Sequence, residues 1–319
     1  MADWFAEHTV TETRGLLLDR DEVLAARFIP HGELASGMRV TARLTHKKTG
    51  ASRGVAVDTQ GNEILIDRIP SGVTEGQEIS IEIFRAAMHE FARTKLAQGR
   101  VVQANYPSEE PGQSIFTALP IRDPRDDLWS EILHSAASNS VDFAGGTLHF
   151  SPTPAMTLID IDGAMSPREL ALAAVPQIAR WVRLFDIGGS IGIDFPTLAA
   201  KADRRAVDDA LAEALVDWPH ERTSMNGFGF VQIVARLEGP SLLHRFANAR
   251  AEMAARIVLH QASRISEPGA IQLSLHPAAR ANIRPSWLDA LAARTGREIR
   301  FETDPALALE SGFAQAVPR

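Results

Sequence analysis

The most constraining feature of this 319-residue sequence is a strand, a long helix and a second strand that follow one another between residues 157 and 195. In the runs from Thr157 to Asp162 and from Ile191 to Phe195, apolar residues alternate with polar or small ones, which is typical of β-strands. Between them, Ser166-Pro167-Arg168-Glu169 predicts a capping box with proline at the first helical position. Helical spacing continues to Phe185, and Gly188-Gly189 ends the helix. The pattern therefore predicts a β-α-β unit with parallel strands and a right-handed crossover.

The rest of the chain predicts a mixed α+β and α/β protein with several parts. Short β-rich runs separated by turn signals predict a small antiparallel barrel or meander within residues 1–85. Four prolines between residues 106 and 124 indicate an irregular connector, which we assign to residues 86–123. A helix from Pro124 to Ala137, capped by Asp123, would open a central β-α-β-α domain over residues 124–247, with a further helix from Asp203 to Trp218. Residues 248–319 repeat the alternation of helix and strand and predict a small α/β domain.

Composition excludes several classes of function. The sequence has no cysteine, so it cannot form a disulfide, a thiolate zinc site or a cysteine nucleophile. Its net charge of -7 argues against binding nucleic acid mainly through bulk charge. It also lacks a GxGxxG loop, a P-loop and any histidine pair at metal-ligand spacing. Without a basic-apolar leader or a run of about 18 apolar residues, we expect a cytoplasmic protein with no membrane anchor.

Three aspartates are the candidate catalytic residues. Strand alternation places Asp160 and Asp162 on one face of their strand, and the same counting places Asp194 opposite Ile191 and Ile193. If the strands are parallel neighbours, the three carboxylates gather at one sheet edge and repel one another unless a cation joins them. Hard oxygen ligands favour Mg²⁺, with Mn²⁺ as an alternative, and such an ion can activate water against a phosphodiester. The sequence therefore predicts a metal-dependent nuclease.

A simpler interpretation stays open for these acids and for the cations that follow them. Aspartates at strand ends commonly cap helices or face solvent, and we assign Asp186 and Asp203 to that kind. Lys201, Arg204 and Arg205 follow Asp194 closely and are candidate phosphate ligands, but a solvated helix face explains them nearly as well.

The run TLIDIDGAMSPRELALAAVPQIARWVRLFDIGGSIGID resembles the catalytic segment of the ribonuclease E/G family. The resemblance implies that Asp160 and Asp194 hold the catalytic Mg²⁺. It places Asp162 where the family has an asparagine that orients the two acids. It also matches Arg236 to a family arginine, which we add to the candidate RNA-binding residues, whereas Gly227 stands where the family tends to have arginine.

A weaker resemblance extends to the N-terminal part. The runs RGLLLDRDEVLAARF and RGVAVDTQGNEILIDRIP are similar to the part of the family that carries an S1-like (OB) RNA-binding β-barrel. The positions of its aromatic platform are taken here by Ala56, Ile64 and Leu65, which implies weak base stacking. Only the stretch from Met88 to Arg122 is available for the family's 5′-monophosphate sensor, so we expect that domain to be reduced or absent. The paired-cysteine zinc link, expected near residues 237–248, cannot form, so no zinc is expected and any homo-oligomer needs another interface.

The resemblance implies an Mg²⁺-dependent endoribonuclease that cleaves single-stranded RNA with metal-activated water. The alternative from another class is a catalytically inactive RNA-binding or assembly protein that kept the same fold. A DNA nuclease also stays open, because nothing in the sequence reports on recognition of a 2′-hydroxyl.

Overall fold

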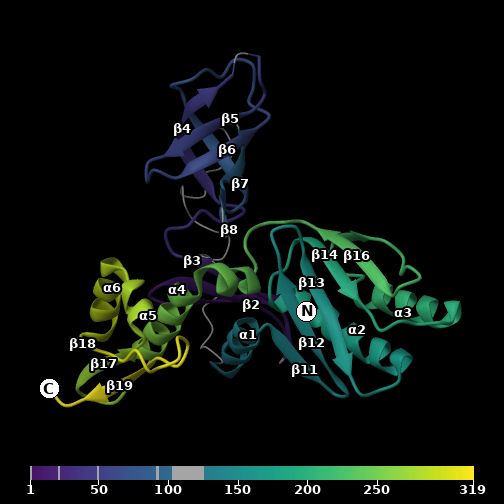
Figure 1. Ribbon diagram of the computed structural model, residues 1–319. Helices are drawn as coiled ribbons and strands as arrows, with labels where there is room; N and C mark the ends of the chain where they lie inside the picture. The colour runs from purple at the N-terminus through teal and green to yellow at the C-terminus, as the bar shows by residue number, and fades with distance from the viewer. Residues whose placement is uncertain (1, 21, 49, 91–92, 103–125) are drawn as a thin grey trace.

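The structure is a computed structural model that describes residues 2–20, 22–48, 50–90, 93–102 and 126–319 (Figure 1). The three prolines of the predicted connector, and Asp123 and Pro124 at the start of the predicted helix, lie outside the described residues. No described helix is long and apolar enough to cross a membrane.

The first three strands form an antiparallel sheet of their own. They are β1 (Asp3–His8), β2 (Glu12–Asp19) and β3 (Glu22–Pro30), in the order β1-β2-β3. Leu16, Leu18 and Phe28 of this sheet belong to the same buried core as the central domain. The structure thus differs from the expectation that residues 1–30 belong to the barrel region, because strand alternation does not specify which sheet a strand joins.

A closed five-stranded barrel follows and has a separate core. Its strands run in the order β10-β6-β5-β4-β7 and are β4 (Arg39–Lys47), β5 (Gly54–Asp58), β6 (Glu63–Asp67), β7 (Glu78–Arg85) and β10 (Ala97–Val101). The predicted barrel is confirmed, but its last strand lies beyond residue 85, after the small hairpin of β8 (Met88–Glu90) and β9 (Arg93–Lys95). Figure 1 shows the barrel standing at the top of the molecule, away from the two α/β parts.

The central domain is a six-stranded sheet covered by helices. Its strands, in the order β11-β12-β13-β14-β16-β15, are β11 (Ser140–Phe143), β12 (Gly146–Pro152), β13 (Thr157–Gly163), β14 (Gly189–Asp194), β16 (Phe230–Ala235) and β15 (His220–Arg222). The helices are α1 (Asp126–Ser138), α2 (Pro167–Leu184) and α3 (Lys201–Ala214). Within this sheet β13 and β14 are parallel, as the sequence predicts, and the other paired strands are antiparallel.

Helix α2 shows why one strand face is buried and the other is left open. Its apolar side chains, such as Ile178, pack with Ile159 of β13 and Ile193 of β14 in one core, to which α3 adds Val207 and Leu211.

The predicted capping box is not formed, because the Ser166 hydroxyl bonds the Glu169 carboxylate and makes no hydrogen bond to a backbone amide. Proline at the first turn and the glycine-rich stop after Leu184 are as predicted.

The C-terminal domain is joined to the central one by a single long helix. Helix α4 (Leu242–Ser263) begins six residues before the predicted start at Asn248, at the N-cap Ser241, and bends at Ala249. Its first half, with Phe246, packs in the central core, and its second half, with Val258, packs in the C-terminal core. That core also contains β17 (Ala270–Leu275), α5 (Pro277–Ala281), α6 (Pro285–Thr295), β18 (Ile299–Thr303) and β19 (Phe313–Val317), with strand order β18-β17-β19.

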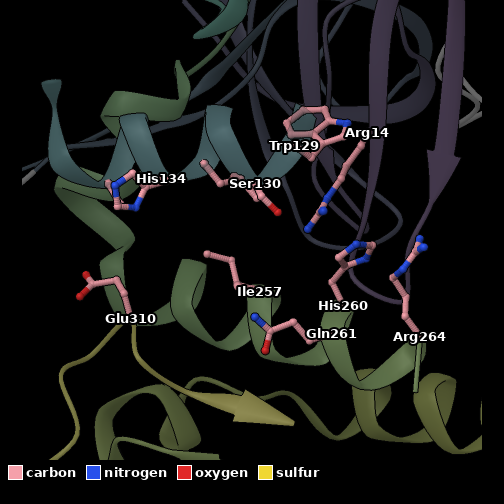
Figure 2. A pocket seen from close by; sticks show the side chains of 11 residues that line it. Arg14, Trp129, Ser130, His134, Ile257, His260, Gln261, Arg264 and Glu310 are labelled. Carbon is pink, nitrogen blue, oxygen red and sulfur yellow. The ribbon is translucent and has the colours of Figure 1, made fainter. Parts of the chain in front are cut away.

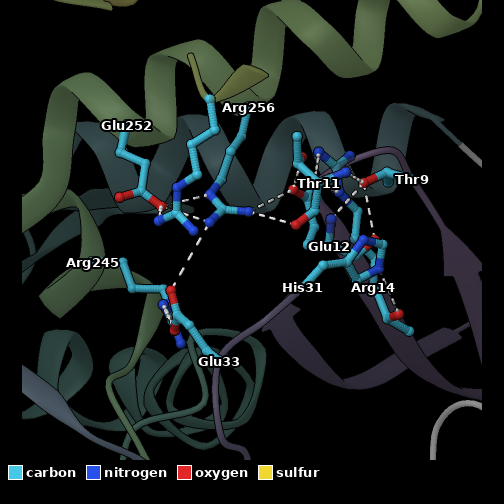
Figure 3. A network of polar contacts seen from close by, with 11 residues as sticks. Thr9, Thr11, Glu12, Arg14, His31, Glu33, Arg245, Glu252 and Arg256 are labelled. Carbon is cyan, nitrogen blue, oxygen red and sulfur yellow. Dashed lines mark hydrogen bonds and ion pairs between the residues drawn. The ribbon is translucent and has the colours of Figure 1, made fainter. Parts of the chain in front are cut away.

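A buried ionic network fastens β2 to α4 (Figure 3). Glu12 is fully buried, and its carboxylate bonds Arg14 at 2.7 Å and Arg256 at 3.5 Å. Arg256 is 1% exposed and also donates to the Thr11 carbonyl at 2.6 Å and to Glu252 at 2.5 Å. Burial by itself raises the pKa of Glu12, but Arg14, Arg256 and the Thr11 hydroxyl outweigh it and hold that pKa below its usual value. The network therefore keeps an ionised carboxylate between two buried guanidinium groups.

Candidate functional site

The predicted acids lie on the open face of the central sheet. Asp160 of β13 and Asp194 at the end of β14 are register partners on adjacent parallel strands, and both side chains are exposed. Neighbouring strands are about 4.8 Å apart, so the two carboxylates project side by side. His149 of β12 pairs with Asp160 on the other side, and Phe230 of β16 pairs with Asp194. We call these four residues, His149, Asp160, Asp194 and Phe230, the central row.

Asp162 lies on the same face as the central row but turns to a different partner. Its Oδ2 is 3.5 Å from Nε2 of His149, and both side chains are exposed. Asp160, in contrast, accepts a hydrogen bond from the backbone N–H of Ile161 at 2.9 Å. The sequence did not single out His149. Because His149 alternates with the buried Leu148 and Phe150, the sequence could have placed its side chain on the polar face of the strand. The sequence could not have shown that His149 pairs with Asp160, because that depends on the register between two strands.

Two helix N-termini lie at the same end of the sheet. Helix α2 begins four residues after β13 ends, and α3 begins at Lys201, soon after β14 ends at Asp194. Arg168 in the first turn of α2 bonds Asp203 in the first turn of α3 at 3.1 Å, so the two N-termini are held together. Neither N-cap residue, Ser166 or Ala200, makes a side-chain cap hydrogen bond. Backbone N–H groups at such ends favour anions such as phosphate.

The described residues contain no group of three or more His, Asp or Glu side chains placed to hold one metal ion. The expectation that Asp160, Asp162 and Asp194 converge on a single ion is therefore not met. The reason is the spacing along β13, where Asp162 lies two positions after Asp160 and so about 6.6 Å away, and the contact of Asp162 with His149. What the structure brings together is the pair Asp160 and Asp194.

Comparison with known proteins points to the same part of the chain. Residues 108–236 match the profile of the Ribonuclease E/G family, and this span holds the central row, Asp162 and both helix N-termini. The central region of this chain thus resembles the Ribonuclease E/G family. Ribonuclease E of Escherichia coli (strain K12) is 36% identical over 110 residues, which cover 31% of this chain and 10% of that protein. The resemblance inferred from the sequence is confirmed for this region.

Two further relatives match over a shorter part. Ribonuclease E of Buchnera aphidicola subsp. Acyrthosiphon pisum (strain APS) is 35% identical over 83 residues, which cover 23% of this chain and 9% of that protein. A chloroplastic Ribonuclease E/G-like protein of Arabidopsis thaliana is 35% identical over 82 residues, which cover 22% of this chain and 8% of that protein. The chain thus spans about a tenth of the length of the curated relatives that it matches.

The four cations predicted to bind RNA lie at different positions in the central domain. Lys201 and Arg205 are exposed in the first turns of α3, where Arg205 lies 3.7 Å from Asp209. Arg204 donates to the Leu198 and Ala199 carbonyls and so holds the loop before α3. Arg236 follows the opposite end of β16, about 20 Å along the strand from the residue that pairs with Asp194, and is 3.5 Å from Glu238. The structure therefore places Lys201, but not Arg236, at the end of the sheet where Asp194 lies.

The barrel positions compared with the family's aromatic platform need a correction. Ala56 and Ile64 are fully buried register partners inside the barrel, so neither could present a ring to solvent. Their outward neighbours Val55 and Leu65 face each other on the partly exposed side. Phe84 of β7 is the aromatic residue that the barrel strands carry.

A cavity of about 490 Å³ lies elsewhere, between β2, α1, α4 and the segment before β19 (Figure 2). Its walls include Arg14, Trp129, His260 and Arg264, and they include none of the predicted site residues. Burial lowers the pKa of His260 to about 3, and the nearby Arg14 and Arg264 contribute to that shift while Glu12 opposes it. His260 is therefore neutral at physiological pH.

Proposed function

We propose that this chain is an Mg²⁺-dependent endoribonuclease that cleaves single-stranded RNA at the central row. The observation that carries the proposal is the side-by-side position of Asp160 and Asp194 on exposed, adjacent parallel strands. Relatives that this chain matches over part of its length are named as ribonucleases, which supports RNA as the substrate class.

The donor set of the site fits Mg²⁺. This ion prefers oxygen ligands and is commonly bound through one or two carboxylates together with water and substrate phosphate. Asp160 and Asp194 supply two carboxylates, so a third protein ligand is not required. When bound, the ion supplies an activated water and neutralises charge on the phosphate.

The remaining side chains would then bind and orient the substrate. The N-termini of α2 and α3, with Lys201, would attract the phosphate next to the scissile one. His149 would restrain Asp162 through their contact, so Asp162 would shape the local charge without binding the ion. Because the face is open, an extended single strand can lie across it.

We also propose that the barrel binds RNA as an S1-type module. We number β4, β5, β6, β7 and β10 as barrel strands 1 to 5. Strand 2 then lies between strands 1 and 3, strand 5 lies between strands 3 and 4, and strands 3 and 5 are parallel. Five-stranded barrels of the OB type bind oligonucleotides on the face of their second and third strands. Here that face carries Val55 and Leu65, so binding by the barrel should be weak and should depend on salt.

One observation favours a second candidate, a catalytically inactive RNA-binding protein with the same fold. Asp162, next to the pair of acids on β13, is in contact with His149. If that pairing draws the carboxylates away from a productive arrangement, RNA would bind without being cleaved.

The test is to incubate the purified full chain with an end-labelled single-stranded RNA in Mg²⁺ or in EDTA, with a DNA strand of the same sequence alongside. Internal cleavage of RNA that needs Mg²⁺ would support the enzyme, and binding without cleavage would support the inactive protein. Cleavage of the DNA strand at a similar rate would contradict the choice of RNA. Cleavage that is equally fast in EDTA would exclude the proposed role of Asp160 and Asp194.

A further inference from the structure

An exposed aromatic side chain lies in the turn before β16, the strand that pairs with β14 beside Asp194. Phe228 is 83% exposed and lies in the turn from Asn226 to Gly229, immediately before β16. A large side chain held this far out in water gives the fold little stability, since the benefit of an aromatic residue comes from burying it. A single exposed apolar residue is common, so the geometry of its turn and of its neighbours decides whether it has a role.

The turn that carries Phe228 is fixed by its own hydrogen bonds. The side-chain oxygen of Asn226 accepts from the backbone N–H of Phe228 at 2.8 Å and from that of Phe230 at 3.1 Å. Gly229 has a φ of +91°, and a Cβ there would lie 2.5 Å from the Phe195 carbonyl oxygen, so only glycine fits. The Phe195 N–H donates back to Gly229 at 3.2 Å. The turn is therefore tied to the residue that directly follows Asp194.

An apolar surface continues from this turn across the sheet. A Cβ on Gly192 would lie 2.5 Å from the ring of Phe230 and 2.9 Å from Leu158, so the missing side chain leaves room for both. Leu158 is 37% exposed, and Phe230 is partly exposed. We call Leu158, Gly192 and Phe230 the apolar floor. Leu158 and Gly192 are two residues before Asp160 and Asp194 on the same strands, so they lie about 6.6 Å from the acids on the same face. Phe230 is the register partner of Asp194.

We infer that Phe228 and the apolar floor form a stacking platform for a nucleobase of the RNA strand whose phosphate lies at Asp160 and Asp194. This inference rests on the proposed function. A base next to the scissile phosphate is within reach of the floor, since stacked nucleotides advance about 3.4 Å along a strand. Every base has a flat apolar face, so an aromatic platform binds single strands with little preference for sequence.

A stacking platform on the central sheet would supply the aromatic contacts that the barrel strands offer only sparsely. Single-strand binders combine a path for the backbone with aromatic side chains for the bases. The barrel strands carry one aromatic residue, Phe84, and their outward pair is Val55 and Leu65. Stacking is thus provided beside the acids, on the central sheet.

The experiment compares the affinity of the full chain for a short fluorescent single-stranded RNA with its affinity for an abasic strand of the same backbone, both without Mg²⁺. We expect wild type to prefer the strand with bases, and Phe228→Ala to lose roughly 5- to 150-fold of that preference, the range for one base stacked on an aromatic ring. Phe228→Trp should retain the preference. Val216→Ala is the matched control, because Val216 is 75% exposed at the far end of α3 and should leave both affinities unchanged.

The outcomes separate this inference from the nuclease proposal, because binding is measured without cleavage. If wild type binds both strands equally or binds neither, or if Phe228→Ala keeps the preference, the stacking platform is wrong whatever the protein cleaves. An equal loss in Val216→Ala would also overturn it. If the platform result holds and Mg²⁺ produces no cleavage, the platform stands and the nuclease proposal fails.

Discussion

Replacing Glu12 with glutamine should destabilise the protein strongly, because it removes the carboxylate between two buried guanidinium groups. Arg14 is 2% exposed and its charged partner in the network is Glu12, whereas Arg256 keeps Glu252 and the Thr11 carbonyl. Removing one member of a buried ion pair typically costs about 3–5 kcal/mol, since the other charge stays buried without compensation. We therefore expect the free energy of unfolding of Glu12→Gln to fall by about 3–5 kcal/mol at neutral pH.

Urea unfolding followed by tryptophan fluorescence measures this loss directly. The Arg14 guanidinium lies 5.5 Å from the Trp129 ring centre and that of Arg256 lies 4.5 Å from the Trp287 ring centre, so both indoles report on the network. Asp209→Asn is the matched control, because its exposed pair with Arg205 should contribute less than about 1 kcal/mol. A loss below about 1 kcal/mol for Glu12→Gln would refute the claim that the network depends on its charge.

Two further predictions concern pH and RNA binding. The pKa of His260 in the folded protein is about 3, below the unfolded value of about 6.5, so only the unfolded chain binds this proton in between. Stability should therefore fall by up to about 1.4 kcal/mol per pH unit below pH 6.5, and His260→Gln should reduce that slope in urea titrations; an unchanged slope would contradict the assignment. RNA binding measured by fluorescence anisotropy at several salt concentrations gives the slope of log K against log[salt]. Lys201→Ala should reduce the magnitude of this slope by about 0.7, the value for one phosphate contact on a single strand, and Arg236→Ala should reduce it by much less. Equal effects of the two variants would place the RNA path elsewhere.

The sequence predicts the β-α-β unit well because all its signals are local. The alternation in β13 and β14, Pro167 at the first turn and the glycine-rich stop lie within 40 residues, and the right-handed crossover then makes the strands parallel. These local signals are enough to predict that Asp160 and Asp194 share one face of the sheet. The catalytic role of these acids stays a prediction.

The remaining parts depend on pairings that the sequence does not encode locally. His149 meets Asp160 and Asp162 only through the register of β12 with β13, which no motif reports. At the barrel, the resemblance matches Ala56 and Ile64 to an outward platform although both point inward, because a shift of one residue exchanges the two faces of a strand. The same limit explains why the sequence pattern groups β2, with Leu16 in the central core, with the barrel region.

The measurement that tests the nuclease proposal most directly is the rate of RNA cleavage by Asp194→Asn in saturating Mg²⁺. Removing one of two carboxylates should cost several kcal/mol of transition-state stabilisation, so we expect the rate to fall about a hundredfold or more. The variant should be as stable as wild type or more so, because repulsion from Asp160 is relieved. Asp209→Asn, the same substitution on the exposed side of α3, should cleave at the wild-type rate. Cleavage by Asp194→Asn at the wild-type rate would contradict the proposal that Asp160 and Asp194 form the active site.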